Sequence, residues 1–452
     1  MLHLKQFPSR SMDMLHGSLW DKILFFSLQL ALTSTLQQMY NTADVVMLGR
    51  FMGDDAIAAV GNNLAVIGIM VNLFVGLSLG ANVVTARYIG QGDLQNANRS
   101  LYSALNLGLV FGFLVAIPVI VVSDAITSAL DVPPQVFNYS KSYLTWYMAG
   151  MPFLALFNFE AAIFRAIGDT STPLKALFIS SILNAALDYI FLSFDMGISG
   201  VAVATSMANF FSALYLFIKL LNSRGVLKLD IRKLYIFELR KVRAIVCIGL
   251  PAGIQGMVFS LSNLVIQGAI NSLGAEVMAA SSAALVYELN IYVFIMAFGM
   301  ATTTFVSQNY GAGNLKRCSE SVRTAMCLNF LVTILLSLIM AVYGRDLLGL
   351  LTADKQVVDL AWTRVYSIIL LYFICVPFEV FSGAMRGFGY SLPPALATTV
   401  TIVGTRMIWL VTVFKHYPDF ASLLITYPVS WLMASPFIFW LYMRCTRRLR
   451  RG

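Results

Sequence analysis

Twelve apolar segments of membrane-spanning length follow one another along this chain of 452 residues. Each is about 20–30 residues long, which is enough for a helix to cross the hydrocarbon core, and short polar loops separate them. Inside a bilayer only helices and closed barrels satisfy their backbone hydrogen bonds, and continuous apolar runs favour helices. We therefore predict an all-α integral membrane protein with twelve transmembrane helices, at residues 23–49, 56–86, 100–123, 142–164, 173–194, 199–219, 244–270, 277–307, 324–344, 361–385, 393–414 and 420–443.

The composition supports a membrane protein and argues against several other classes. Hydrophobic residues make up 58% of the chain and charged residues only 12%, whereas soluble domains have about 25% charged residues. The five cysteines show no CxxC spacing, which argues against disulfides and against a zinc site. No Walker A or hydrolase motif is present, so we expect neither an enzyme nor an organic cofactor.

Lysine and arginine residues predict the orientation in the membrane. With the N-terminus placed in the cytoplasm, 24 of the 31 fall on the cytoplasmic side and 6 on the outer side. Short cytoplasmic loops carry such an excess, so both termini are expected in the cytoplasm of a cell whose plasma or inner membrane holds the protein. The basic tail at 444–452 is expected to contact anionic lipid rather than nucleic acid. We expect no obligate protein partner.

An internal repeat appears when the chain is shifted by 221 residues. Three pairs of motifs fall into register without a gap: GQGDL at 90–94 with GAGNL at 311–315, RAIGDTSTP at 165–173 with RGFGYSLPP at 386–394, and Thr205 with Thr426. Each half contains six helices, so both halves enter the membrane from the same side, as in parallel repeats related by an axis along the membrane normal. The predicted organisation is an N-lobe (1–222), a basic cytoplasmic linker (223–243), a C-lobe (244–443) and the basic tail (444–452). Two such lobes are typical of transporters.

Carboxylates inside the predicted helices are the first candidates for a functional site, because charge within a bilayer is costly. They are Asp44, Glu160, Asp188, Glu288 and Glu379. Three polar side chains of the N-lobe, those of Asp44, Asp188 and Thr205, lie at one depth, about 10 Å below the outer surface at 1.5 Å per residue.

Local spacing adds neighbours to this polar group. Tyr40 and Asn41 can share a helix face with Asp44, Gln37 lies one turn further, and Asn184 stands four residues before Asp188. Such oxygen ligands suit a proton or a sodium ion; with sodium the ligands would be Asp44, Asn184 and Asp188. The alternative is a polar cluster that only ties helices together.

The remaining charges inside the helices have other expected roles. Glu160 and Glu379 precede Arg165 and Arg386 by five and seven residues. We expect both carboxylates either to reach the cytoplasmic surface or to pair with an arginine. Glu288 is the best carboxylate candidate in the C-lobe. Arg406, taken here as the one cation inside a helix, is expected to pair with a C-lobe glutamate.

Several motifs resemble the multidrug and toxic compound extrusion (MATE) family. They are NTADVVMLGR (41–50), ARYIGQGD (86–93), FRAIGDTSTP (164–173), NAALDY (184–189), GVAVAT (200–205), GLP (249–251), SLGAE (272–276) and QNYGAGN (308–314). The resemblance implies a V-shaped pair of lobes that exchanges small amphiphilic organic cations for H⁺ or Na⁺ by alternating access. It also implies a cation site at Asp44, Asn184, Asp188 and Thr205, with Tyr40, Tyr143 and Asn158 lining the same lobe.

Two departures from that family pattern stand out. Gln29 and Leu30 occupy the place where some relatives bend the first helix at a proline. The seventh helix has Gln255 and Gln267 but no carboxylate, so a sodium site there is expected to be absent or altered. A lipid-linked precursor flippase and a dedicated natural-product exporter are the alternative functions.

Overall fold

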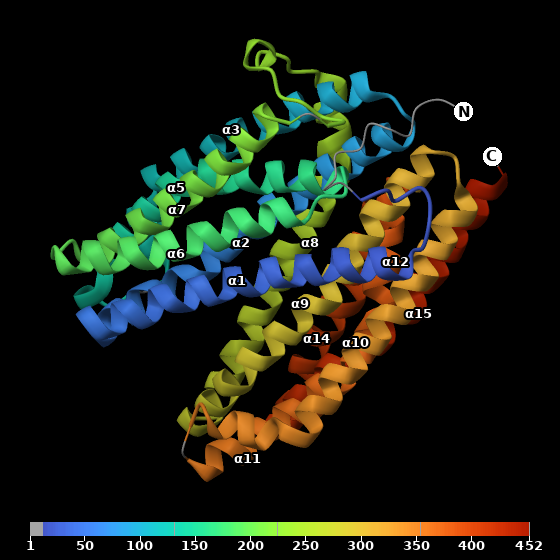
Figure 1. Ribbon diagram of the computed structural model, residues 1–452. Helices are drawn as coiled ribbons and strands as arrows, with labels where there is room; N and C mark the ends of the chain where they lie inside the picture. Colours follow the sequence, from blue (N-terminus) through green and yellow to red (C-terminus); the bar gives the residue numbers. More distant parts are fainter. Residues whose placement is uncertain (1–11, 131, 224, 353, 452) are drawn as a thin grey trace. The chain divides into compact units, whose positions relative to one another are not determined.

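The computed structural model describes residues 12–130, 132–223, 225–352 and 354–451, and these form helices joined by short loops (Figure 1). The α-helices are Trp20–Met52 (α1), Asp54–Gly90 (α2), Leu94–Val121 (α3), Ser123–Ala129 (α4), Pro134–Ala166 (α5), Ser171–Ser193 (α6), Gly197–Leu221 (α7), Leu239–Asn271 (α8), Ala275–Gly311 (α9), Leu315–Gly349 (α10), Lys355–Ile368 (α11), Cys375–Gly387 (α12), Leu392–Thr398 (α13), Gly404–Trp409 (α14) and Phe420–Arg451 (α15). Short 3₁₀ or π turns are Ile231–Lys233 (η1), Ile369–Ile374 (η2), Thr399–Val403 (η3) and Leu410–Phe414 (η4).

The predicted all-α class and the twelve predicted segments are confirmed. Eleven helical segments within the described ranges are long and apolar enough to cross a membrane. The twelfth, α1, has 33 residues, or about 50 Å of helix, and runs without a break past Gln29. It is less hydrophobic than the other eleven because its second half carries Gln37, Gln38, Asn41 and Asp44.

The chain forms two compact units. Unit 1 contains Leu32–Gly253 together with the short segment that ends at Asp13, and unit 2 contains Met14–Ala31 and Ile254–Gly452. These units differ from the predicted lobes because α1 and α8 each divide between them. The part of α1 up to Ala31 packs in unit 2, where the Phe26 and Phe305 rings lie 5.7 Å apart.

The first half of α8 packs on α2 in unit 1 through two glycine pairs. The pairs are Gly76 with Gly80 on α2, and Gly249 with Gly253 on α8, each with the spacing GxxxG. A Cβ added at Gly76 would lie 2.1 Å from the backbone nitrogen of Gly253. Small residues at this spacing let helix backbones approach closely in membranes. The linker before α8 therefore leads into a helix that begins in unit 1.

We expect Gly80→Ala to destabilise unit 1. A Cβ at this position would lie 2.1 Å from the Ile245 carbonyl oxygen, and overpacking of this kind costs about 1–3 kcal/mol. Thermal unfolding of the purified protein in detergent measures the effect. Gly61→Ala is the matched control on the same helix, because a Cβ there meets nothing within 4 Å. An unchanged midpoint for Gly80→Ala would contradict the close α2–α8 contact.

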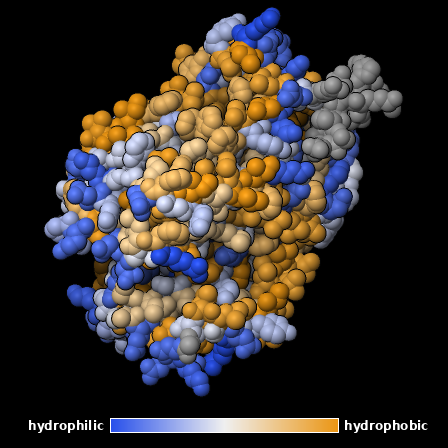
Figure 2. Space-filling model, turned by 60° about the vertical axis from the view of Figure 1, so that its left-hand side comes forward, coloured by the Kyte–Doolittle hydropathy of each residue, from blue (hydrophilic) through white to orange (hydrophobic). Residues whose placement is uncertain are grey.

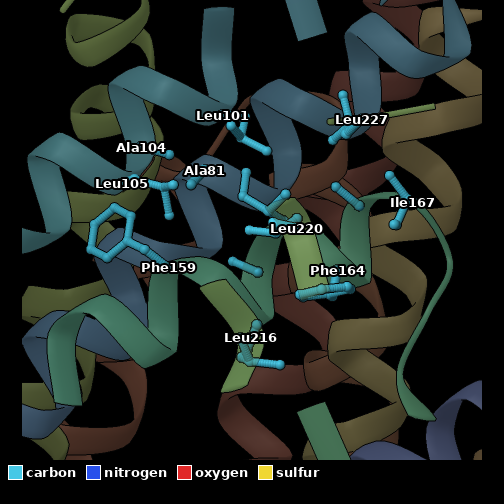
Figure 3. Packing of buried hydrophobic residues seen from close by; sticks show 14 of the residues in the cluster. Ala81, Leu101, Ala104, Leu105, Phe159, Phe164, Ile167, Leu216, Leu220 and Leu227 are labelled. Atoms are coloured by element: carbon cyan, nitrogen blue, oxygen red, sulfur yellow. The ribbon is translucent and has the colours of Figure 1, made fainter. Parts of the chain in front are cut away.

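One apolar core cluster of unit 1 joins α3, α5 and α7 at the end away from the α1–α2 loop, and another lies toward that loop. Figure 3 shows Leu101 and Leu105 of α3, Phe159 of α5 and Leu216 of α7 gathered in the first cluster, and none of them is more than 3% exposed. This packing fixes the positions of the helices that carry polar residues toward their other ends.

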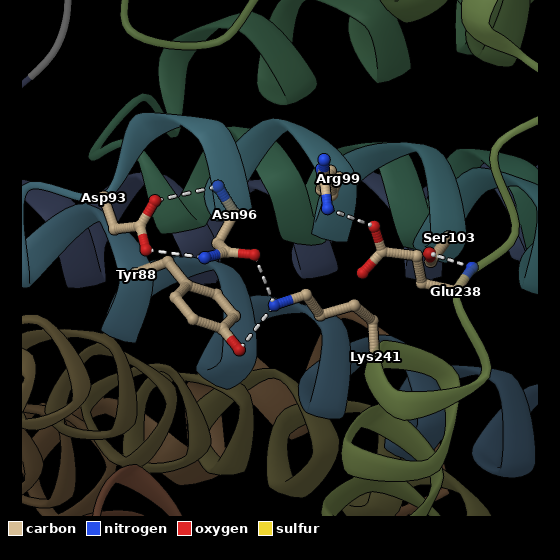
Figure 4. Close-up of polar contacts among 7 residues, drawn as sticks. All are labelled: Tyr88, Asp93, Asn96, Arg99, Ser103, Glu238 and Lys241. Atoms are coloured by element: carbon tan, nitrogen blue, oxygen red, sulfur yellow. Dashed lines mark hydrogen bonds and ion pairs between the residues drawn. The ribbon is translucent and has the colours of Figure 1, made fainter.

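Hydrogen bonds hold the linker between α7 and α8, together with the first turn of α8, against α2 and α3 (Figure 4). Lys241, which is 8% exposed, donates to the Tyr88 hydroxyl at 2.6 Å and to the Asn96 amide oxygen at 2.9 Å. Arg99 forms an ion pair with Glu238 at 3.1 Å. The Asn106 amide donates to the backbone carbonyls of Leu234 and Ile236. The basic linker is thus a folded part of unit 1.

Exposed apolar side chains follow the outer faces of the helices. On α3, Val110, Leu114, Ile117 and Val121 are 56–75% exposed and recur every three or four residues. Figure 2 shows a broad hydrophobic area on the side of the molecule that it displays. Such a surface is unfavourable in water and suits contact with lipid chains.

The later helices of unit 2 are irregular. The 3₁₀ turn η2 stands directly before α12. Pro377, near the beginning of α12, cannot donate a backbone hydrogen bond to the preceding turn. The next span alternates α and π geometry as α13, η3, α14 and η4.

Each unit has an end that we call its distal end. In unit 1 it is the end with the α1–α2 and α6–α7 loops. In unit 2 it is the repeat-related end, with the α8–α9 and α14–α15 loops.

Candidate functional site

Four polar side chains from three helices form a buried group near the distal end of unit 1. Asp44 lies on α1, Asn184 and Asp188 on α6, and Thr205 on α7, and each is at most 3% exposed. Their positions lie five to nine residues from the distal helix ends, or about 8–14 Å along the helices. The structure thus brings together the four residues singled out in the sequence, and we call them the acidic cluster.

Thr205 links two helices within the acidic cluster. Its hydroxyl is 3.0 Å from Asp44 Oδ2 and 2.9 Å from the Val201 carbonyl oxygen. A hydroxyl has one proton, so Thr205 can donate to only one of these oxygens at a time. When it donates to the carbonyl, a contact with Asp44 remains favourable only if the carboxyl carries the proton. The two contacts of the Thr205 hydroxyl are therefore compatible with both the charged and the protonated form of the Asp44 carboxyl.

The acidic cluster contains polar atoms that the protein leaves unsatisfied. Asp44 Oδ1, both carboxylate oxygens of Asp188 and both side-chain atoms of the Asn184 amide are buried without a hydrogen-bond partner in the described part of the chain. Asp44 also interacts electrostatically with Asp188. Two buried carboxylates at short range repel each other, and unpaired buried acceptors are costly. A bound proton or hard cation would relieve both effects, and the donor set of carboxylate, amide and hydroxyl oxygens fits such an ion.

Tyrosine rings surround the acidic cluster. Tyr40, Tyr143 and Tyr147 all interact electrostatically with Asp44, and the rings of Tyr143 and Tyr147 lie 5.7 Å apart. Tyr147 was not among the predicted residues. Its position four residues after Tyr143 on one helix was the signal that could have identified it.

Three predicted residues do not join the acidic cluster. Asn41 is exposed, and Gln37 is only partly buried. The Asn158 amide donates to the Leu154 carbonyl of its own helix at 2.8 Å, and Asn158 lies eleven residues from Tyr147, or about 16 Å along α5.

The prediction for Glu160 was wrong, whereas Glu379 does interact with an arginine. Glu160 is fully buried, and its oxygens have no partner among the described residues, so it neither reaches the surface nor pairs with Arg165. Glu379 accepts a hydrogen bond of 2.8 Å from the Tyr292 hydroxyl and interacts electrostatically with Arg386. Both Glu160 and Arg165 are buried, but Arg165 is five residues further along α5, and positions five residues apart do not share a helix face.

In unit 2, Glu288 pairs with an arginine that the sequence analysis missed. Arg364 of α11 is 2% exposed, and its Nε lies 2.7 Å from Glu288 Oε2. Its Nη1 donates to the Ser281 hydroxyl at 2.7 Å. Glu288 is therefore held by an internal counter-ion, whereas the buried oxygens of Asp188 have no partner among the described residues.

The expected pairing of Arg406 with a glutamate was wrong. Its Nη1 donates to the Asn263 amide oxygen at 3.0 Å, and its guanidinium lies 4.3 Å from the centre of the Tyr427 ring. Arg364 occupies the place beside Glu288 instead. On α8, Gln255 accepts a hydrogen bond of 2.7 Å from Arg386, so this glutamine serves an internal contact.

Comparison with known proteins gives a family match across both halves. A sequence model of the MatE family matches residues 30–190 and 251–411, which together make up more than half of the chain. The second match begins 221 residues after the first, and this confirms the internal repeat.

Curated relatives and a solved structure align with most of this chain. The chain is 24% identical over 440 residues to "Probable multidrug resistance protein YoeA" of Bacillus subtilis, covering 94% of each protein. It is 27% identical over 396 residues to "Probable multidrug resistance protein NorM" of Thermotoga maritima, covering 83% of this chain and 81% of that protein. A MOP superfamily transporter from Pyrococcus furiosus has the same fold, with a TM-score of 0.90, 20% identity, and coverage of 99% of this chain and 100% of the other.

Proposed function

This chain belongs to the MATE family of membrane transporters, and on that premise we propose that it exports small amphiphilic organic cations in exchange for H⁺ or Na⁺. The observation that carries the proposal is the acidic cluster, a buried pair of carboxylates with unsatisfied oxygens. A group that served only to tie helices together would satisfy its own hydrogen bonds. The unsatisfied oxygens of Asp44 and Asp188 instead favour an ion that comes and goes.

Ion binding at the acidic cluster changes the balance of forces among α1, α6 and α7. Without an ion, Asp44 and Asp188 carry like charges in a buried place, which is unfavourable. A proton on one carboxyl removes a charge, while a sodium ion would be held by Asp44, Asp188 and the amide oxygen of Asn184. Because the ligands come from different helices, binding draws these helices together. In the proposed alternating-access cycle this local change accompanies the switch between inward and outward exposure.

The surroundings of the acidic cluster support a cationic substrate. Tyr40, Tyr143 and Tyr147 all interact electrostatically with Asp44, and Tyr143 also interacts with Asp188. Organic cations are attracted both by negative charge and by the faces of aromatic rings. In the proposed cycle, an ion and a substrate that both carry positive charge compete for the same negative potential, and this competition couples their movements in opposite directions.

The distribution of basic residues supports an orientation for the exchange. The arginines of the C-terminal tail at 444–451 are exposed, and basic segments favour the cytoplasmic surface. We propose that both termini lie in the cytoplasm of a plasma or inner membrane and that the distal ends face outward. The acidic cluster then lies about 10 Å below the outer surface, within reach of ions driven inward by their gradient.

Proteoliposomes test the proposal and identify the coupling ion. The vesicles contain a fluorescent organic cation, and a proton gradient or a sodium gradient is imposed separately. We expect efflux above that of protein-free vesicles under one of the two gradients. Efflux at the same rate without any gradient would contradict coupled exchange. No efflux under either gradient would contradict the proposed substrate class.

A further inference from the structure

Two arginines lie buried near the distal end of unit 2. Arg364 of α11 is 2% exposed, and Arg406 of α14 is 6% exposed. Arg364 lies nine residues from the beginning of α11 at Lys355, and Arg406 lies eight residues before the end of η4 at Phe414, or about 12–14 Å in each case. The 221-residue repeat aligns Arg364 with Tyr143 of unit 1. The distal part of unit 1 thus carries two buried aspartates, whereas that of unit 2 carries these two buried arginines.

One of these positive charges is neutralised within the protein. Arg364 forms the 2.7 Å ion pair with Glu288. A second carboxylate well inside a spanning segment of unit 2, that of Glu379, accepts a hydrogen bond from Tyr292 and interacts with Arg386. Both carboxylates thus already have partners.

Arg406 has polar and aromatic neighbours but no acidic partner among the residues that the structure describes. Its Nη1 donates to Asn263 at 3.0 Å, its Nε lies 3.4 Å from the Ser430 hydroxyl, and the Tyr427 ring lies beneath it. These contacts orient the guanidinium while leaving its charge uncompensated. A buried charge without a counter-ion is strongly unfavourable, so the site has an intrinsic affinity for an anion.

The backbone around Arg406 is unusual for a spanning helix. The π turns η3 and η4 stand directly before and after α14, which carries the arginine. π turns inside helices are rare and are frequent at functional sites, because they alter the direction in which a side chain points. The irregular geometry thus lies directly around a buried arginine that has no acidic partner in the described part of the chain.

A free hydroxyl lies on the neighbouring helix face. Thr426 of α15 is fully buried, and its hydroxyl has no hydrogen-bond partner among the described residues. It stands four residues before Ser430, so both hydroxyls share one face of α15. Thr426 is also the repeat counterpart of Thr205 in the acidic cluster.

We propose that Arg406, with Thr426, binds an oxyanion such as a carboxylate, sulfonate or phosphate group. Guanidinium groups bind such anions through charge-assisted hydrogen bonds, and the unpartnered Thr426 hydroxyl can donate to a remaining oxygen. The Ser430 hydroxyl donates to the Tyr427 carbonyl at 2.7 Å, so its part is to orient the guanidinium. The anion is carried either by a small molecule that the protein transports or by a lipid headgroup. This site goes beyond the proposed function, since the coupling ion and an organic cation would bind at the acidic cluster.

Binding to purified protein tests the site without any transport step. Wild type, Arg406→Gln and Arg345→Gln are placed in phosphatidylcholine nanodiscs and titrated with 1-naphthalenesulfonate by calorimetry. Arg345→Gln is the matched control, because the Arg345 side chain is 62% exposed and forms an ion pair with the similarly exposed Asp359. The neutral 1-naphthalenesulfonamide controls for apolar binding.

We expect the sulfonate to bind wild type and Arg345→Gln equally and Arg406→Gln at least tenfold more weakly. The sulfonamide should bind all three proteins weakly and alike. Equal sulfonate affinity in wild type and Arg406→Gln, or equal affinity of wild type for both compounds, would overturn the proposal. If Arg406→Gln does not fold, Thr426→Val is used instead. Valine has nearly the shape of threonine, and this variant keeps the charge of Arg406. We expect it to bind the sulfonate severalfold more weakly, and an unchanged affinity would contradict the site.

A second arm identifies the source of the anion. The wild-type titration is repeated in phosphatidylglycerol nanodiscs. If the sulfonate affinity is unchanged, the natural anion is part of a small molecule. If sulfonate binding is lost, and native mass spectrometry finds phosphatidylglycerol bound to wild type but not to Arg406→Gln, the anion is a lipid headgroup. The outcome is also independent of the liposome assay: sulfonate binding that depends on Arg406 would stand even if no organic cation is exported.

Discussion

Proteoliposomes containing Asp44→Asn are expected to lose all gradient-driven efflux and to fall to the level of protein-free vesicles. The substitution removes the charge of one carboxylate but keeps the size of the side chain. An asparagine oxygen still accepts the hydrogen bond that Thr205 donates at 3.0 Å. The neutral amide, however, cannot take up a proton and binds sodium far more weakly than a carboxylate.

Folding should survive this substitution. Asp44 interacts with Asp188 in a buried place, so removing one of two like charges relieves repulsion. We expect the thermal midpoint of Asp44→Asn to equal or exceed that of wild type. The matched control is Asp54→Asn, because Asp54 is exposed at the first turn of α2, and its efflux should be normal. If Asp44→Asn and Asp188→Asn both retain full efflux at normal expression, the acidic cluster does not couple the ion.

Replacing either partner of the Glu288–Arg364 pair by methionine is expected to cost about 3–5 kcal/mol in the free energy of unfolding, because it leaves the other charge buried and unpaired. The two side chains are 8% and 3% exposed, and their contact is 2.7 Å. The double variant Glu288→Met with Arg364→Met removes both charges, so it should be more stable than either single variant. Unfolding of all four proteins in a double-mutant cycle measures the coupling.

An exposed ion pair between α10 and α11 provides the control for this cycle. Asp359 of α11 pairs with Arg345 at 3.2 Å, and both side chains are more than 60% exposed. Surface pairs contribute about 0–1 kcal/mol, so Asp359→Asn should change stability little. Similar costs for the buried and the exposed pair would show that Arg364 has another counter-charge in the membrane.

The two halves of the repeat have come to differ in charge while keeping one fold. Thr205 and Thr426 occupy equivalent positions, yet Thr205 contacts a carboxylate and Thr426 shares a helix face with a residue that contacts Arg406. A shared backbone framework therefore presents a negative site in unit 1 and a positive site in unit 2. The efflux experiment with an organic cation tests the negative site, and the calorimetric titration with a sulfonate tests the positive site.

Much of the fold and part of the site follow from the sequence alone. Hydropathy is a local property of the chain, so the spans were found, and the 221-residue repeat organised them into two halves. Depth is also local, since the rise per residue in a helix is fixed. That is why Asp44, Asp188 and Thr205 were expected together, and the structure finds them so.

The tertiary structure decided what depends on rotation about a helix axis and on the choice of neighbours. Asn41 and Asp44 are three residues apart on α1, yet one is exposed and the other buried. Glu160 packs in the interior, Arg364 rather than Arg406 meets Glu288, and α1 and α8 divide between the units. Side-chain direction relative to other helices results from packing between distant segments, and no local pattern encodes it.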